Sequence, residues 1–104
     1  MALTPIGGEK ITVSSTALGF TAAEIPPTKT RVIMARVQHR SGGNLFHLAH
    51  QAPVAGGTSG EFDFRQHDEI EVWGDKALTN TKFIIQSGES DGIIAVQYYG
   101  EGGS

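Results

Sequence analysis

Apolar and polar residues alternate along most of this chain with a period of two, which is the spacing of side chains on the two faces of a β-strand. The longest such run is residues 30–39, where Ile33, Ala35 and Val37 share one face. The opposite face is apolar at first and becomes polar toward the end of the run. This pattern predicts a central strand, and its β-branched residues favour a strand over the competing helix.

Shorter runs show the same alternation and are separated by Gly, Pro, Asp, Asn and Ser. Residues 10–16 place Ile11 and Val13 on one face and suit an edge strand. Residues 45–49 are expected to pair back onto the long run as its hairpin partner, across a turn at residues 41–44. The other expected strands are residues 61–65, 69–73, 82–86 and 93–99, with a hairpin loop at 87–92.

These runs predict an all-β fold in which a single domain spans residues 1–104. The expected architecture is a single β-sandwich of about seven to eight short antiparallel strands. A chain of 104 residues buries roughly two-thirds of its unfolded surface, which is enough for one core. Strand spacing does not encode strand order, so jelly-roll-like and immunoglobulin-like connectivities both stay open.

Three segments are expected to lie outside the regular structure. Residues 1–9 are predicted to be an irregular, flexible N-terminal arm, because Pro5 and the Gly7–Gly8 pair interrupt any strand pattern. Residues 50–60 are predicted to be a long loop, and loops of that length are usually functional or mobile. Residues 100–104 are predicted to be a short tail.

Composition and charge exclude several classes of partner. The net charge is −3 and the basic residues are scattered, so the basic stripe of a nucleic-acid-binding protein is missing. The chain has no cysteine, which excludes disulfides and thiolate metal sites and fits synthesis in a reducing cytosol. Its start does not resemble a signal peptide, and no apolar run approaches the roughly 20 residues that span a bilayer. We expect neither nucleic acid nor membrane as a partner.

Four histidines, His39, His47, His50 and His67, are the obvious candidates for a metal site. On a strand His47 and His50 would point to opposite faces, so they could converge only if the chain bends at Ala49. Metal-binding β-barrels called cupins typically carry two histidines one residue apart, and this chain has no such pair. We therefore expect solvated or turn-capping histidines, no metal ion and no cofactor, and keep a cupin-like metal protein as the third alternative.

Catalytic motifs are equally scarce. Glu61 with Asp63, and Glu69 with Glu71, share a face within each strand, but apolar residues occupy the opposite phase, so these carboxylates are expected on the solvent face. There is no Gly-x-Ser-x-Gly nucleophile motif, and the glycine-rich segments lack the Lys-Ser/Thr ending of a phosphate-binding loop. The sequence predicts a protein that is not an enzyme.

Aromatic residues near the strand ends could serve recognition. Trp73, Tyr98 and Tyr99 could form a sugar-binding platform or anchor a protein interface. Three of the five phenylalanines, with either tyrosine, are expected to fill the core. These are Phe62, Phe64 and Phe83.

Three segments in the second half of the chain form a common pattern: a strand ending in an aromatic residue and glycine at 70–74, a Phe-Ile strand at 83–84, and a last strand closing on Tyr98-Tyr99-Gly100. In this pattern the second half resembles small structural proteins of tailed bacteriophages. A Lys-Ile-Thr-Val strand at 10–13 completes the resemblance. The chain differs at residues 51–57, where a turn of the Asp-Gly-Thr-Pro-Thr type was expected.

This resemblance implies a virion protein made in the host cytoplasm, most simply a capsid decoration (cement) protein that binds major capsid subunits. Such proteins commonly act as homo-oligomers, and a trimer is favoured here. The alternative is a tail-associated structural or carbohydrate-binding module that uses surface aromatic residues. The residues expected at an interface are Leu3, Pro5, Ile6, Val54, Trp73 and Tyr99.

Overall fold

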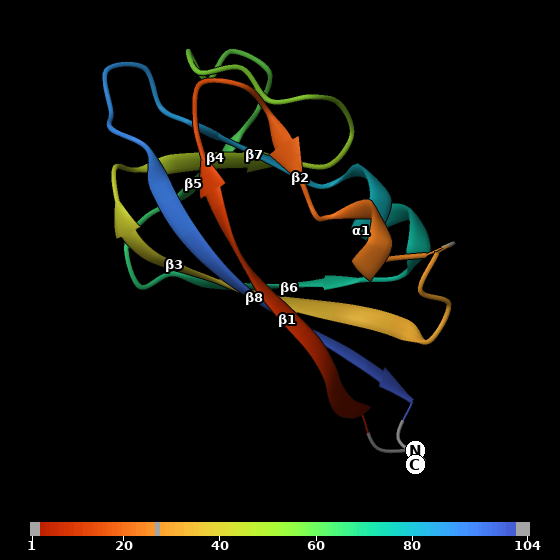
Figure 1. Ribbon diagram of the computed structural model, residues 1–104. Helices are drawn as coiled ribbons and strands as arrows, with labels where there is room; N and C mark the ends of the chain where they lie inside the picture. The colour runs from red at the N-terminus through yellow and green to blue at the C-terminus, as the bar shows by residue number, and fades with distance from the viewer. Residues whose placement is uncertain (1–2, 27, 102–104) are drawn as a thin grey trace.

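The computed structural model describes residues 3–26 and 28–101, which form two antiparallel four-stranded sheets facing one another (Figure 1). The all-β sandwich expected from the alternating pattern is therefore confirmed. The elements are β1 (Leu3–Val13), β2 (Leu18–Gly19), a 3-10 turn (Ala22–Glu24), β3 (Val32–Gly42), β4 (Leu45–Leu48), β5 (Phe62–Phe64), β6 (Glu69–Trp73), α1 (Asp75–Asn80), β7 (Lys82–Ile85) and β8 (Gly92–Glu101).

The strand order is that of a jelly roll. One sheet, here called the long sheet, has the order β1-β8-β3-β6, and the other, the short sheet, has the order β2-β7-β4-β5. Strands pair as β1 with β8, β2 with β7, β3 with β6 and β4 with β5, as if one long hairpin had been rolled up. This nested pairing is the jelly-roll arrangement of two Greek keys. It selects one of the two connectivities that the sequence left open.

Both expected hairpins are wrong, because each joins strands of different sheets. β4 does not pair with β3 but with β5 and β7, and β8 pairs with β1 and β3 rather than with β7. The β3–β4 and β7–β8 connections, which cross between the sheets, lie against each other: Asn44 O accepts a 3.1 Å hydrogen bond from Gln86 N. A Cβ atom on Gly42, whose φ is 91°, would lie 2.2 Å from the carbonyl oxygen of Asp91, so only glycine fits this crossing.

The expected flexible arm is also wrong for residues 3–9, which belong to β1; residues 1–2 lie outside the described part of the chain. β1 pairs with β8 from Leu3 opposite Glu101 to Val13 opposite Gly92. A bulge between Pro5 and Gly7 accommodates the proline, which an edge strand tolerates because one side of it needs no backbone donor. In the expected tail, 100–101 are strand residues, and 102–104 are not described.

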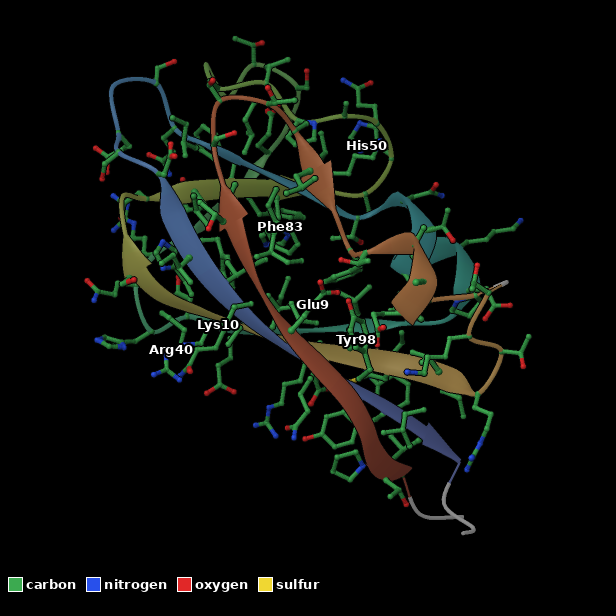
Figure 2. The ribbon with its side chains drawn as sticks, viewed as in Figure 1. Glu9, Lys10, Arg40, His50, Phe83 and Tyr98 are labelled. Carbon is green, nitrogen blue, oxygen red and sulfur yellow. The ribbon has the colours of Figure 1, made fainter. Side chains whose placement is uncertain are left out.

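The space between the sheets is filled by aromatic rings. The Phe20 ring packs edge-on against Phe83 and Tyr98, with both centroid separations 5.9 Å, and Phe64 lies 5.7 Å from Phe83 (Figure 2). Phe64, Phe83 and Tyr98 are buried as expected, whereas Phe62, expected in the core, is 65% exposed. Phe62 sits on the edge strand β5 at an open side of the sandwich, where the ring is only partly covered.

The loop between β4 and β5 is confirmed as a long irregular segment, and it covers the outer face of the short sheet. A Cβ atom on Gly57 would lie 2.8 Å from the Phe46 ring, so the loop backbone rests on that ring. Ser87 N donates a 2.9 Å hydrogen bond to Ala55 O and ties the loop to the end of β7. Ile84, which pairs with Phe46, is only 6% exposed.

The short helix α1 follows Gly74 and buries Leu78 against the core, and the sequence pattern does not predict it. Six residues with one apolar anchor give no periodic signal that could be read along the chain. Within residues 3–26 and 28–101, no helix is long and apolar enough to span a membrane.

Replacing Phe83 by Ala should lower the free energy of unfolding by about 3–5 kcal/mol, because it leaves a cavity in the ring cluster. Phe62→Ala, in a strand of the same sheet, should cost less than about 1 kcal/mol because the ring is exposed. Urea unfolding followed by circular dichroism would measure both values. Equal losses in the two variants would contradict the assignment of Phe62 to the surface.

Candidate functional site

The outer face of the long sheet is the open face of this sandwich, since the short sheet covers its inner face. Along β3, Ala35 and Val37 are fully buried and point inward, so Met34, Arg36 and Gln38 point outward. The strands β1, β3 and β8 have ten or eleven residues, whereas those of the short sheet have two to four. The long sheet therefore extends beyond the short one, in a molecule measuring 45 × 24 × 20 Å (Figure 1).

A line of apolar and aromatic residues crosses all four strands of this face. Pro5 is opposite Tyr99, Tyr99 is opposite Met34, and Met34 is opposite Trp73. Met34 is only 5% exposed despite its outward position, which its two aromatic neighbours explain, and Trp73 is 51% exposed. We call Pro5, Tyr99, Met34 and Trp73 the aromatic row.

Three of the six expected interface residues thus lie side by side in the aromatic row: Pro5, Trp73 and Tyr99. Met34 was missed, because the strand pairing that sets it between two rings is not readable from local sequence. Leu3 is half-buried and follows the row along β1, opposite Glu101.

The other two expected interface residues, Ile6 and Val54, lie elsewhere. Ile6 is the residue at the β1 bulge and packs on the core from the inner side. Val54 belongs to the loop that covers the short sheet, so the structure does not bring it to the aromatic row. Its side chain is 40% exposed, and its backbone N donates a 2.6 Å hydrogen bond to Glu61.

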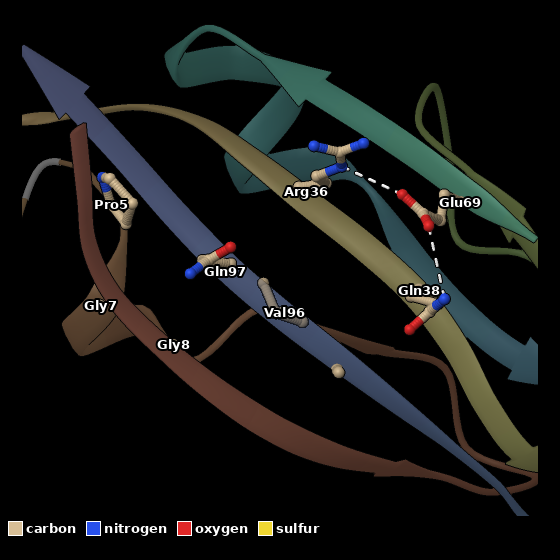
Figure 3. A pocket seen from close by; sticks show the side chains of 9 residues that line it. Pro5, Gly7, Gly8, Arg36, Gln38, Glu69, Val96 and Gln97 are labelled. Atoms are coloured by element: carbon tan, nitrogen blue, oxygen red, sulfur yellow. Dashed lines mark hydrogen bonds and ion pairs between the residues drawn. The ribbon is translucent and has the colours of Figure 1, made fainter. Parts of the chain in front are cut away.

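A shallow polar groove of about 480 Å³ lies next to the row (Figure 3). Its floor is low because Gly8 and Ala95 carry almost no side chain. On its rim, Arg36 Nε donates to Glu69 Oε1 at 3.0 Å, and Gln38 Nε2 donates to Glu69 Oε2 at 3.4 Å. The hydrogen bond and charge of Glu69 hold the pKa of Arg36 above its ordinary value, so this guanidinium stays charged. The Arg36–Glu69 ion pair is exposed, so it fixes the positions of these two side chains and contributes little to the stability of the fold.

The aromatic row is supported from behind by a carboxylate that faces the sandwich interior. Tyr98 Oη and Thr21 Oγ1 both donate hydrogen bonds to Glu9, and Thr21 N donates to Glu9 Oε2 at 3.3 Å (Figure 2). Burial of Tyr98, and then the Glu9 carboxylate, raise the pKa of the Tyr98 hydroxyl well above its ordinary value. Because Tyr98 is fully buried, it cannot belong to a sugar-binding platform.

The histidines are dispersed, and two of them differ from expectation. His39 is fully buried, with Nε2 2.7 Å from Gly43 O, and His47 is half-buried among phenylalanine rings. Burial lowers the pKa of His47, which favours its neutral form. His50 and His67 are exposed, as expected. The described residues contain no group of three or more His, Cys, Asp or Glu side chains that could hold a metal ion.

The acidic residues take structural positions. Glu69 and Glu71 are exposed on β6, which confirms the expected solvent face, and Glu71 accepts a 3.1 Å hydrogen bond from the Trp73 indole. Glu61 accepts hydrogen bonds from the backbone N of Val54 at 2.6 Å and of Ser59 at 2.7 Å, which lower the pKa of Glu61. Glu61 therefore fixes the long loop.

Comparison with protein-family models, with curated proteins and with solved structures gave no match. An apolar row bordered by amide groups and an ion pair can contact another protein or a sugar ring.

Because the pKa of Tyr98 is raised on folding, its contribution to stability is complete below the pKa of an unfolded tyrosine, about 10, and is lost as the pH rises further. The free energy of unfolding should fall by up to about 1.4 kcal/mol per pH unit above pH 10 because of this group. Denaturant titrations between pH 8 and 11.5 would measure the slope (roughly spanning that pKa). Tyr98→Phe should flatten it, while Tyr99→Phe should keep it; identical slopes in all three proteins would contradict the role of Tyr98.

Proposed function

We propose that this protein is a non-enzymatic virion protein of a tailed bacteriophage, most simply a capsid decoration protein that binds major capsid subunits through the outer face of its long sheet. The observation that carries the proposal is the aromatic row, which joins Pro5, Tyr99, Met34 and Trp73 in one line across four strands.

A protein partner suits this surface. Tyr and Trp are enriched among the residues that dominate binding energy at interfaces, and such residues are typically ringed by polar groups. Here Trp73 is 51% exposed, and Arg36, Glu69 and Gln97 border the row. The face lies on a long paired sheet, so little ordering cost would be deducted from the affinity.

The virion assignment rests on the resemblance to phage structural proteins, whose matching segments lie in β1, β6, β7 and β8. The jelly roll recurs in viral capsid and lectin domains and in cupins, so the fold is compatible with this reading but does not decide it. Residues 3–9 belong to β1, so they contribute to the paired sheet face and not to a flexible arm. A homo-oligomer, with a trimer favoured, would multiply a modest contact by avidity.

A second candidate function is carbohydrate binding in a tail-associated module. Trp73 and Tyr99 both flank Met34 on the same face. They lie two strand spacings apart, roughly 10 Å, which would let both rings contact one oligosaccharide. This candidate uses the same row but requires a glycan instead of a protein surface.

Placing a charge in the row should abolish assembly. Tyr99→Glu should reduce binding to shells built from the major capsid protein of the same phage by at least about 30-fold, corresponding to about 2 kcal/mol at an interface centre. Ile93→Glu is the matched control, because Ile93 is 37% exposed on β8. It lies on the same face roughly 20 Å from Tyr99. Co-sedimentation and light-scattering mass would measure attachment and oligomeric state.

Full shell binding by Tyr99→Glu, or equal losses in both variants, would refute attachment through the row. The row would instead be a carbohydrate-binding surface if the wild-type protein binds an immobilised glycan but not shells, and if Tyr99→Glu abolishes that glycan binding.

A further inference from the structure

A second surface, which shares Trp73 with the aromatic row, lies at the edge of the long sheet. β6 pairs only with β3 among the described strands. Gly74 N donates to Ile33 O at 2.9 Å and His39 N donates to Asp68 O at 3.0 Å. Hydrogen-bonded pairs alternate along an antiparallel ladder, and Val72 and Ile70 lie at every second position between these two bonds. The backbone N–H and C=O groups of Ile70 and Val72 therefore point toward β3. The backbone N–H and C=O groups of 69, 71 and 73 therefore point to the open edge.

An apolar groove of about 290 Å³ runs beside this edge, where β6 of the long sheet faces β5 of the short sheet. Phe62 pairs with His47 and lies in phase with the buried Phe64, so it points toward the groove, yet it is 65% exposed. Trp73, 51% exposed, is on the opposite rim. The walls between them include Ile70, Val72 and Ala77.

A second copy of the chain is a poor occupant of this edge. Antiparallel two-fold pairing of β6 about residue 71 would set Glu71 against its own symmetry mate. Pairing about residue 70 would set Glu69 against Glu71, and pairing about residue 72 would leave only residues 71–73 to pair, because α1 begins at Asp75. Like charges directly opposite each other destabilise a strand pair, so the edge is protected against self-association.

We propose that this edge binds an extended segment of a partner protein, which adds to the long sheet as a fifth strand beside β6. Its side chains would alternate between the two faces of the sheet. Those on the outer face would lie next to Glu69 and Glu71 and should be Lys or Arg. Those on the inner face would enter the groove beside Phe62 and should be apolar. The occupant is thus a segment of alternating basic and apolar residues. This proposal does not depend on the proposed function, because Phe62 and the β6 backbone take no part in the aromatic row.

The test uses capped synthetic peptides of alternating lysine and valine. Binding is followed by the emission of Trp73, the chain's single tryptophan, and by amide hydrogen exchange. The lysine peptide should bind at least tenfold more tightly than its glutamate counterpart and should slow exchange of the Glu71 and Trp73 amides. Alternate backbone N–H groups of the peptide point to opposite edges of the added strand, so N-methylation of every second residue removes the donors of one edge only. Methylation of the set that faces β6 should abolish binding, and methylation of the other set should preserve it.

Phe62→Ser should weaken peptide binding at least tenfold. Leu18→Ser is the matched control, since Leu18 is 43% exposed on a different edge strand of the short sheet, and it should bind normally. Absence of binding at millimolar peptide, equal effects of the two sets of methylations, or equal losses in both variants would overturn the proposal.

Two variants allow shell attachment and peptide binding to be tested independently. Tyr99→Glu should keep peptide binding while losing shell attachment, and Phe62→Ser should show the reverse. Loss of peptide binding in Tyr99→Glu with unchanged folding would place the peptide on the aromatic row and overturn the edge proposal.

Discussion

The pairing of β8 with both β1 and β3 is the interaction on which the rest of the structure depends. It runs from Gly92 to Glu101 against β1 and along nearly all of β3, and it places every second residue of three strands on one open face. Tyr98 and Tyr99 show the consequence of this alternation. The first enters the core and binds Glu9, and the second becomes the centre of the aromatic row.

The outer faces of the two sheets are covered to different extents. The loop from β4 to β5 covers the outer face of the short sheet through its contact with Phe46, and Glu61 holds that loop in place. The outer face of the long sheet has no such cover, and neither does the groove between β5 and β6. Both surfaces proposed for binding therefore keep a large aromatic side chain exposed, Trp73 on the outer face and Phe62 beside the groove.

Local pattern was sufficient to predict most of the strands and most of the core, because the alternation in residues 30–39 and the burial of Phe64 and Phe83 are local properties. Strand partners were not predictable, since the crossing at Gly42 and Asp91 depends on segments nearly fifty residues apart. For the same reason Met34 was not predicted as a site residue, and Ile6 and Val54 were predicted in one interface with residues of the aromatic row although they lie elsewhere. Pro5 and the Gly7–Gly8 pair suggested an irregular arm, but a bulge and an edge position let this segment pair with β8.

If the aromatic row is an assembly surface, acrylamide quenching of Trp73 fluorescence should change when the protein assembles. The side chain is 51% exposed in the single chain, so it should be quenched readily in dilute solution. Quenching should fall several-fold as the protein assembles at high concentration or attaches to shells. A quenching constant that stays the same from dilute protein to shell-saturated samples would contradict the account.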